Sequence, residues 1–274
     1  MPLTDFQRAV LDTVRSNRSV DSHLAGGSAL HLAPDTPRIS NDIDFFHDSA
    51  ERVRSAYDAD ASALRAAGFT ITEQFAAPTF IRALVQRDAQ TATLIDWAFD
   101  SAWRFLPVQL DPVGGYVLQP IDLAVNKTLA LVGRDEARDW VDILYAHSHI
   151  LPLGALVWAA PAKDPGFNPR SLLDLLRRRG RPQPEDVTAL HLTAPFDQQQ
   201  AKLSWLAALD EATVFVDARP PAEAGCLYRD ARTGGFVMPS ADAVVPTDVT
   251  VHRGKLGGVL PLPADLMLTP RLEP

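Results

Sequence analysis

Short apolar runs and helical patterns alternate in the first hundred residues. Residues 4–16 begin with a capping box and repeat apolar side chains on one helical face, and residues 49–67 are alanine-rich and end at Gly68, so we predict a helix in each. A brief helix is predicted over residues 28–32. Runs of strand character occupy residues 23–25, 40–46, 69–75, 79–87 and 91–99. This order predicts a mixed sheet with helices packed against it.

From residue 119 the pattern becomes helical. We predict helices over residues 121–132, 135–148, 170–179, 183–192 and 196–212. The last sixty residues are rich in proline and glycine, and residues 226–230 and 236–239 are expected to pair as a hairpin. The predicted class is therefore α+β, with a mixed-sheet core at 1–118, a mainly helical domain at 119–212 and an irregular, partly β segment of unassigned role at 213–274.

Composition narrows the class of protein only moderately. The chain has 274 residues, 46% of them hydrophobic and 22% charged, which is typical of a globular protein with a substantial core. The net charge of −8 argues against broad nonspecific binding of nucleic acid. A single cysteine excludes an internal disulfide and a cysteine-based zinc site. With neither a signal-peptide pattern nor a long apolar run, we expect a cytoplasmic protein without a membrane partner.

Two aspartates lie one residue apart in the apolar segment 40–46. Alternation along a strand places Asp42 and Asp44 on one face and Ile43 and Phe45 on the other. Two carboxylates about 4 Å apart repel by roughly 4 kcal/mol at an effective dielectric constant near 20. A divalent cation such as Mg²⁺ removes that cost. An isolated Asp-x-Asp often caps or turns the backbone instead, but an apolar strand makes unpaired carboxylates expensive.

Two further features support metal and phosphate chemistry. The turn before this strand contains Gly27 and Ser28, whose exposed backbone N–H groups can hold a phosphate. Asp96 lies in the predicted strand 91–99, and three acidic groups on neighbouring strands can hold two Mg²⁺ ions about 3.5–4 Å apart. Metal together with phosphate indicates phosphoryl or nucleotidyl transfer.

Four other charged residues have two or more interpretations each. Lys127, in a nearly apolar helix, either reaches the surface along its alkyl chain or contacts a triphosphate. Asp139 and Asp142 share a helical face, where they pair with Lys127, position a catalytic base or belong to an exposed ion-paired surface. Arg38 lies in a proline-flanked loop and either contacts a phosphate or is simply exposed.

These segments together resemble the AbiEii/AbiGii family of nucleotidyltransferase toxins, a branch of the DNA polymerase β-like nucleotidyltransferase superfamily. Four stretches carry the resemblance, at residues 24–30 (Leu-Ala-Gly-Gly-Ser-Ala-Leu), 38–46 (Arg-Ile-Ser-Asn-Asp-Ile-Asp-Phe-Phe), 126–127 (Asn-Lys) and 137–142 (Ala-Arg-Asp-Trp-Val-Asp). The first two are fairly specific when taken together. The last two are short, but their order and spacing fit.

The resemblance implies that residues 1–118 form a nucleotidyltransferase core and that a helical domain follows it. It implies Mg²⁺-dependent transfer of a nucleotide from an NTP. In the family's pattern Ser28 holds phosphate, Asp42 and Asp44 bind metal, and Lys127 contacts the nucleotide. Asp142, or as second choice Asp139, completes the catalytic site. Asp96 matches the third strand carboxylate of the superfamily in type and context.

The acceptor is the least specified part of this prediction. Relatives include toxins of toxin–antitoxin pairs, some of which add nucleotides to tRNA acceptor ends. The resemblance thus implies tRNA or another RNA as a candidate acceptor and a cognate antitoxin as a candidate partner. Two alternatives stay open: the same chemistry on a small molecule such as an antibiotic, and a non-catalytic member that binds nucleotide.

Overall fold

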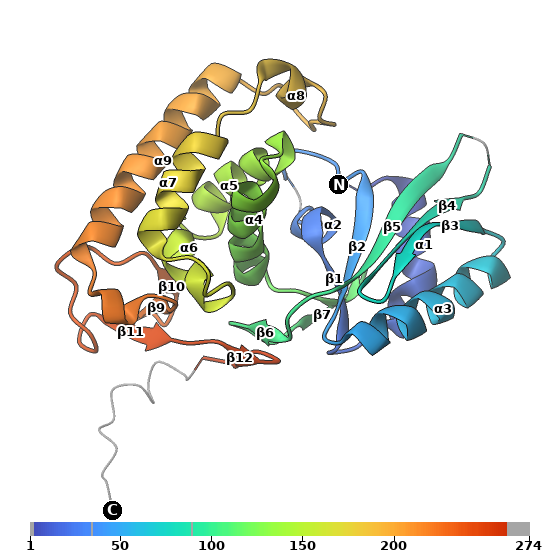
Figure 1. Cartoon of the computed structure of the whole chain (residues 1–274), viewed down its shortest axis with the longest axis horizontal. Coiled ribbons are helices and arrows are strands. Elements are labelled where there is room, and N and C mark those ends of the chain that lie inside the picture. The colour runs from blue at the N-terminus through green and yellow to red at the C-terminus, as the bar shows by residue number, and fades with distance from the viewer. Residues whose placement is uncertain (1–2, 34, 89, 262–274) are drawn as a thin grey trace, which may run out of the picture. The chain divides into compact units, whose positions relative to one another are not determined.

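The computed structural model describes residues 3–33, 35–88 and 90–261. The chain forms two compact units, which we describe one at a time. Unit 1 contains residues 1–123, 188–195 and 256–258, and unit 2 contains residues 124–187, 196–255 and 259–274. Figure 1 labels most of the elements of both units. Residues 262–274 of the predicted C-terminal segment lie outside the described residues.

Unit 1 is built on a seven-stranded mixed sheet with the order β3-β4-β5-β2-β1-β8-β7. The pairs β2–β5 and β1–β8 are parallel, whereas the other neighbours are antiparallel. The five strands predicted from the sequence are present, with ends shifted by a few residues, and the predicted α+β class is confirmed. The strands are β1 (Ser22–Ala25), β2 (Asp42–His47), β3 (Thr70–Ala77), β4 (Phe80–Gln86), β5 (Ala92–Phe99), β6 (Trp103–Arg104, outside this sheet), β7 (Gln109–Asp111) and β8 (Gly115–Val117).

Two helices cover one face of this sheet, as Figure 1 shows. The first, α1 (Asp5–Val14), begins with a capping box in which Thr4 and Gln7 satisfy each other's backbone N–H groups. The second, α3 (Ala50–Ala66), begins after Ser49, whose hydroxyl accepts from the N–H of Arg52. The short α2 (Gly26–Leu30) joins β1 to the loop before β2. All three helices were predicted from the sequence.

We expect His47, at the end of β2, to make the stability of unit 1 depend on pH. Its side chain is fully buried, and neither ring nitrogen has a hydrogen-bond partner among the described residues. Burial, together with the charges of Arg18 and Arg52, lowers the pKa of His47 to about 3. The unfolded chain binds this proton near pH 6.5, so the free energy of unfolding falls as the pH drops below that value. By pH 5 the expected loss is about 2 kcal/mol.

Urea denaturation at pH 7.5 and at pH 5 would measure this loss. In the variant His47→Leu, which has no titrating ring, the difference between the two pH values should shrink by about the same 2 kcal/mol. An unchanged pH difference in the variant would show that another group is responsible.

Unit 2 is mainly helical and ends with a small sheet. The strand β9 (Leu227–Asp230) pairs antiparallel with β10 (Phe236–Val237), which confirms the predicted hairpin, and with β11 (Val249–His252). In the short β12 (Lys255–Leu256), the first residue belongs to unit 2 and the second to unit 1. The helices are α4 (Pro120–Arg134, which starts in unit 1), α5 (Ala137–His149), α6 (Leu153–Ala159), α7 (Pro169–Arg179), α8 (Pro184–Thr188) and α9 (Gln198–Ala218).

One helix of unit 2 has no counterpart in the sequence prediction. Every residue of α6 is buried, and this helix packs against α7 and α9. A Cβ atom on Gly154 would lie 3.2 Å from the Cα of Ala212, so the glycine permits a close approach of α6 to α9. Within the described residues, no single helix has the length and apolarity to cross a membrane, although α5 with residues 153–162, bent by 109°, meets both criteria as a pair.

Candidate active site

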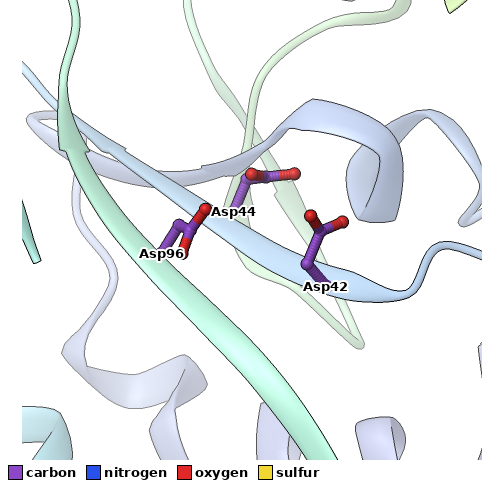
Figure 2. A group of neighbouring side chains, drawn as sticks. All are labelled: Asp42, Asp44 and Asp96. Carbon is purple, nitrogen blue, oxygen red and sulfur yellow. The ribbon is translucent and has the colours of Figure 1, made fainter. Parts of the chain in front are cut away.

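Three aspartates gather on one face of the unit 1 sheet, where β2 and β5 run parallel. Asp44 lies directly opposite Asp96 in the strand register, and Asp42 precedes Asp44 by two residues on the same face. One carboxylate oxygen from each residue lies within 4.8 Å of the other two. Figure 2 shows the three side chains projecting from the same side of the two strands. We call these residues the carboxylate cluster.

The other face of the same strands explains why the cluster is held in this register. Ile43, Phe45, Ile95 and Trp97 are completely buried. The ring of Trp97 packs edge-on against Tyr57 of α3, with the ring centroids 5.1 Å apart. A slip of one residue would exchange this apolar face with the carboxylates, and the burial of unpaired charge would oppose it.

Short-range hydrogen bonds orient the two aspartates of β2. The hydroxyl of Ser40 donates to Oδ1 of Asp42 over 3.0 Å, and the N–H of Gly27 donates to Oδ2 of Asp44 over 3.3 Å. Ser28 is fully buried; its hydroxyl accepts from the N–H of Asp44 over 3.3 Å and donates to the carbonyl of the residue that ends β1 over 3.2 Å. Ser28 therefore ties the turn to β2, and its role in holding phosphate stays a prediction.

Arg82 is the member of this site that the sequence analysis does not identify. It lies opposite Asp96 on β4, and its Nε and Nη2 atoms donate to the two carboxylate oxygens over 2.7 and 2.5 Å. These hydrogen bonds raise the pKa of Arg82, and its charge offsets part of the cluster's negative charge. The signal was present in the sequence, because antiparallel pairing of the two predicted strands brings an arginine in an apolar strand opposite Asp96.

The turn before α2 lies in direct contact with the cluster. Gly26 has a φ of +59°, and a Cβ atom there would lie 1.9 Å from Oδ2 of Asp44. At Gly27 an added Cβ would lie 2.7 Å from the Ser40 hydroxyl and 3.0 Å from Nη2 of Arg38. Both glycines are thus required because side chains of the site approach the backbone closely.

Arg38 is held inside unit 1. It is only 3% exposed, so its interpretation as an exposed loop residue is wrong. Backbone hydrogen bonds fix its loop: Ile39 donates to the carbonyl of His191 over 2.8 Å, and Thr193 donates to the carbonyl of Pro37 over 2.9 Å. The guanidinium lies against the glycine turn, and its contact with a phosphate stays a prediction.

The remaining candidates form a buried ion-pair group in unit 2. The ammonium of Lys127 on α4 lies 3.1 Å from Oδ1 of Asp139 and 2.8 Å from Oδ2 of Asp142, both on α5. The side chain of Lys127 is 7% exposed and those of the two aspartates are completely buried. Neither a surface lysine nor an exposed ion-paired face describes this group, whereas the expected pairing of the aspartates with Lys127 is confirmed.

Asp139 also receives two hydrogen bonds from Arg134, whose Nε and Nη2 atoms lie 2.7 and 2.9 Å from its oxygens. Burial by itself would raise the pKa of Asp139. The hydrogen bonds from Arg134 and the charges of Lys127 and Arg134 outweigh burial and hold the pKa below its ordinary value. The roles of Lys127 in nucleotide contact and of Asp139 or Asp142 in catalysis stay predictions.

Comparisons with known proteins assign most of the chain to a family. Residues 10–224 match the model of a family described as "Nucleotidyl transferase AbiEii toxin, Type IV TA system". A comparison with curated proteins finds no match.

Solved structures show the same fold at low identity. MenT4, a nucleotidyltransferase toxin from Mycobacterium tuberculosis, is 17% identical with a TM-score of 0.51, over 76% of this chain and 82% of its own. A candidate nucleotidyltransferase from Helicobacter pylori is 16% identical with a TM-score of 0.50, over 77% of this chain and 93% of its own. The family match covers most of the chain and confirms the resemblance seen in its motifs, so this protein belongs to the AbiEii family of nucleotidyltransferase toxins.

Proposed function

We propose that this nucleotidyltransferase moves a nucleotide from an NTP to a hydroxyl group of RNA, with tRNA as the first acceptor to test, in a reaction that depends on Mg²⁺. We also propose that it acts as the toxin of a toxin–antitoxin pair. One observation carries the proposal: three carboxylates from neighbouring strands converge within 4.8 Å beside a glycine turn. Such a cluster in a nucleotidyltransferase family is typical of metal-dependent phosphoryl chemistry.

The chemistry of the cluster fits a divalent cation. Its donors are hard carboxylate oxygens, which Mg²⁺ prefers, and the single charge of Arg82 offsets only part of the charge of three neighbouring carboxylates. Asp42, Asp44 and Asp96 would hold the ion. When bound, Mg²⁺ would supply neutralisation of the charge that develops on the phosphoryl oxygens.

The chain's own residues would position the triphosphate and accept the proton of the acceptor hydroxyl. Gly27 and Ser28 would place the triphosphate next to Asp44, and Arg38 would contact it from the loop. The acceptor oxygen would form a bond to the α-phosphorus while the bond from that phosphorus to the bridging oxygen breaks and pyrophosphate leaves. Asp96 would take the proton of the acceptor hydroxyl.

A labelling assay tests this proposal. The intact protein would be incubated with Mg²⁺, total tRNA and each α-labelled NTP in turn, beside a folded Asp42→Ala/Asp44→Ala variant. We expect label on tRNA with the intact protein alone. Label on small polyols or aminoglycosides instead of RNA would favour the small-molecule alternative. Binding of NTP without transfer to any acceptor would favour a non-catalytic member.

The close approach of Gly26 to Asp44 gives a sharper test of the site. A methyl group in Gly26→Ala would displace the Asp44 carboxylate, because its Cβ would lie 1.9 Å from Oδ2. A displacement of about 1 Å in a reacting group can lower the rate about 100-fold, which is the loss of transfer that we expect. Steady-state labelling rates would measure it.

Gly68→Ala is the matched control for this variant. Gly68 also has a positive φ, +83°, but nothing lies within 4 Å of a Cβ added there. Both variants carry a strain of about 1–2 kcal/mol from the left-handed backbone, which thermal melting would report. Only Gly26→Ala should lose activity, and equal activity in the two variants would argue against a role for the turn.

A further inference from the structure

The sheet face that carries the carboxylate cluster continues past it onto the sheet's edge. The register pairs Asp44 with Asp96, Asp96 with Arg82 on β4, and Arg82 with Phe75 on the edge strand β3. Residues directly opposite one another across a sheet share a face. Phe75 and Arg82 are therefore on the same face as the carboxylates.

Two aromatic rings lie together at this edge. The ring centroids of Phe75 and Phe80 are 5.9 Å apart, and the guanidinium carbon of Arg82 lies 5.6 Å from the Phe80 centroid. The side chain of Phe75 is 55% exposed, and that of Arg82 is 39% exposed. We call Phe75 and Phe80 the aromatic pair.

An irregularity in β3 places Phe75 in this position. The pairing of β3 with β4 shifts between Glu73 and Phe75, which leaves Gln74 as an extra residue. A bulge of this kind re-aims the side chains that follow it and is common beside active sites. An exposed phenylalanine on an edge strand is also a liability for aggregation, and a ligand on this face would cover it.

The order of residues across the sheet indicates which of the two substrates would bind at the aromatic pair. If the triphosphate lies at the glycine turn, as the proposed function has it, the turn and the aromatic pair are on opposite sides of the carboxylate cluster. The attacking and leaving oxygens of a phosphoryl transfer are roughly in line. The acceptor hydroxyl must then arrive from the side of Arg82 and the aromatic pair.

We infer that the aromatic pair is a platform on which the last base of a single-stranded RNA acceptor stacks, so that its terminal hydroxyl reaches the carboxylate cluster. Aromatic rings bind bases of any sequence by stacking, and the exposed part of Arg82 suits the adjacent phosphodiester. The net charge of −8 disfavours long electrostatic tracking along RNA, so a short contact dominated by stacking suits this chain. The inference rests on the proposed function.

Substitutions at Phe75 test the platform on the full chain. The acceptor would be a short, unstructured oligoribonucleotide with a free 3′ hydroxyl, and the readouts would be the KM for this RNA, kcat and the Kd for NTP. Stacking on one ring is worth about 1–3 kcal/mol, which corresponds to about 5- to 150-fold. Phe75→Leu, which keeps an apolar side chain but has no ring, should raise the KM for RNA within that range and leave the Kd for NTP unchanged. Phe75→Trp should restore the KM to near that of the intact chain.

Phe99→Leu is the matched control. Phe99 is 46% exposed at the end of β5, but alternation places it on the opposite face from Asp96. Its removal should leave the KM for RNA unchanged. Circular dichroism and thermal melting of all three variants would establish that each is folded.

These measurements distinguish failure of the proposed function from failure of the platform alone. If the intact chain labels no RNA, the proposed function fails and the inference fails with it. If the intact chain labels RNA but Phe75→Leu has the same KM, or Phe75→Trp does not restore it, the platform alone is overturned. If Phe75→Leu weakens only a small polyol or aminoglycoside acceptor, the platform serves a small molecule and the RNA assignment is wrong.

Discussion

Asp44→Asn is expected to lower nucleotidyl transfer by about 100- to 1,000-fold or more, because several kcal/mol of transition-state stabilisation depend on the charge of this carboxylate. Asparagine keeps the shape of the side chain and an oxygen that can accept from the N–H of Gly27. The variant should therefore fold. In the presence of a chelator, the melting temperature of the variant should be no lower than that of the intact chain, because removing one charge from three carboxylates within 4.8 Å relieves repulsion.

Thermal melting with and without Mg²⁺ completes this test. A cation that binds only the folded chain raises the melting temperature, and this increase should disappear in Asp44→Asn. Asp12→Asn, the same chemical change on an exposed residue of α1, should retain both the transfer activity and the Mg²⁺-dependent increase. A folded Asp44→Asn protein with undiminished transfer would refute the assignment of the site.

Strand alternation predicted which face of each strand carries the carboxylates, whereas the meeting of Asp44 and Asp96 also requires the parallel pairing of β2 with β5. The apolar residues Ile43 and Phe45 fix which face of β2 is buried, so Asp42 and Asp44 must share the other face. Asp96 follows the same rule on β5. Helix ends with capping residues, such as Thr4 and Ser49, were predicted for the same reason: the signal is local in the sequence.

Features that depend on tertiary packing were not predicted. The helix α6 is apolar on all sides and only seven residues long, so it has no amphipathic period, and it is stable because α7 and α9 bury it. The ion pair between Arg82 and Asp96 was missed although its signal was present, because it appears only when the two neighbouring strands are paired in register. Ser28 is buried against β2, and Arg38 is buried because residues 191–193 pair with its loop. These contacts join segments that are distant in sequence, so the burial of the two residues could not be predicted from local patterns.

Lys127→Met is expected to lower the free energy of unfolding of unit 2 by about 3–5 kcal/mol, since it leaves two buried carboxylates beside each other without the ammonium that pairs with both. Methionine keeps most of the length and apolar volume of lysine, so the loss would report charge. Urea denaturation at pH 7 would measure it. Adding Asp142→Leu to this variant should recover a large part of the stability, because removing both partners of a buried pair costs less than removing one.

The pH dependence of the same variants distinguishes structural pairing from nucleotide contact. In the intact chain the pKa of Asp139 is lower than its ordinary value near 3.8, so this residue stabilises the fold at pH values above 3.8. That stability is lost as the pH falls through the still lower pKa of the folded state. In Lys127→Met the two carboxylates have lost the ammonium, although Asp139 keeps its hydrogen bonds from Arg134, so uptake of a proton should make the destabilisation shrink as the pH falls toward 4. A lysine whose role is to contact the triphosphate predicts the opposite result: unchanged stability at every pH, with a large rise in the Kd for NTP. Measuring unfolding and NTP binding on one set of variants would therefore assign Lys127 to the buried ion-pair group or to the nucleotide.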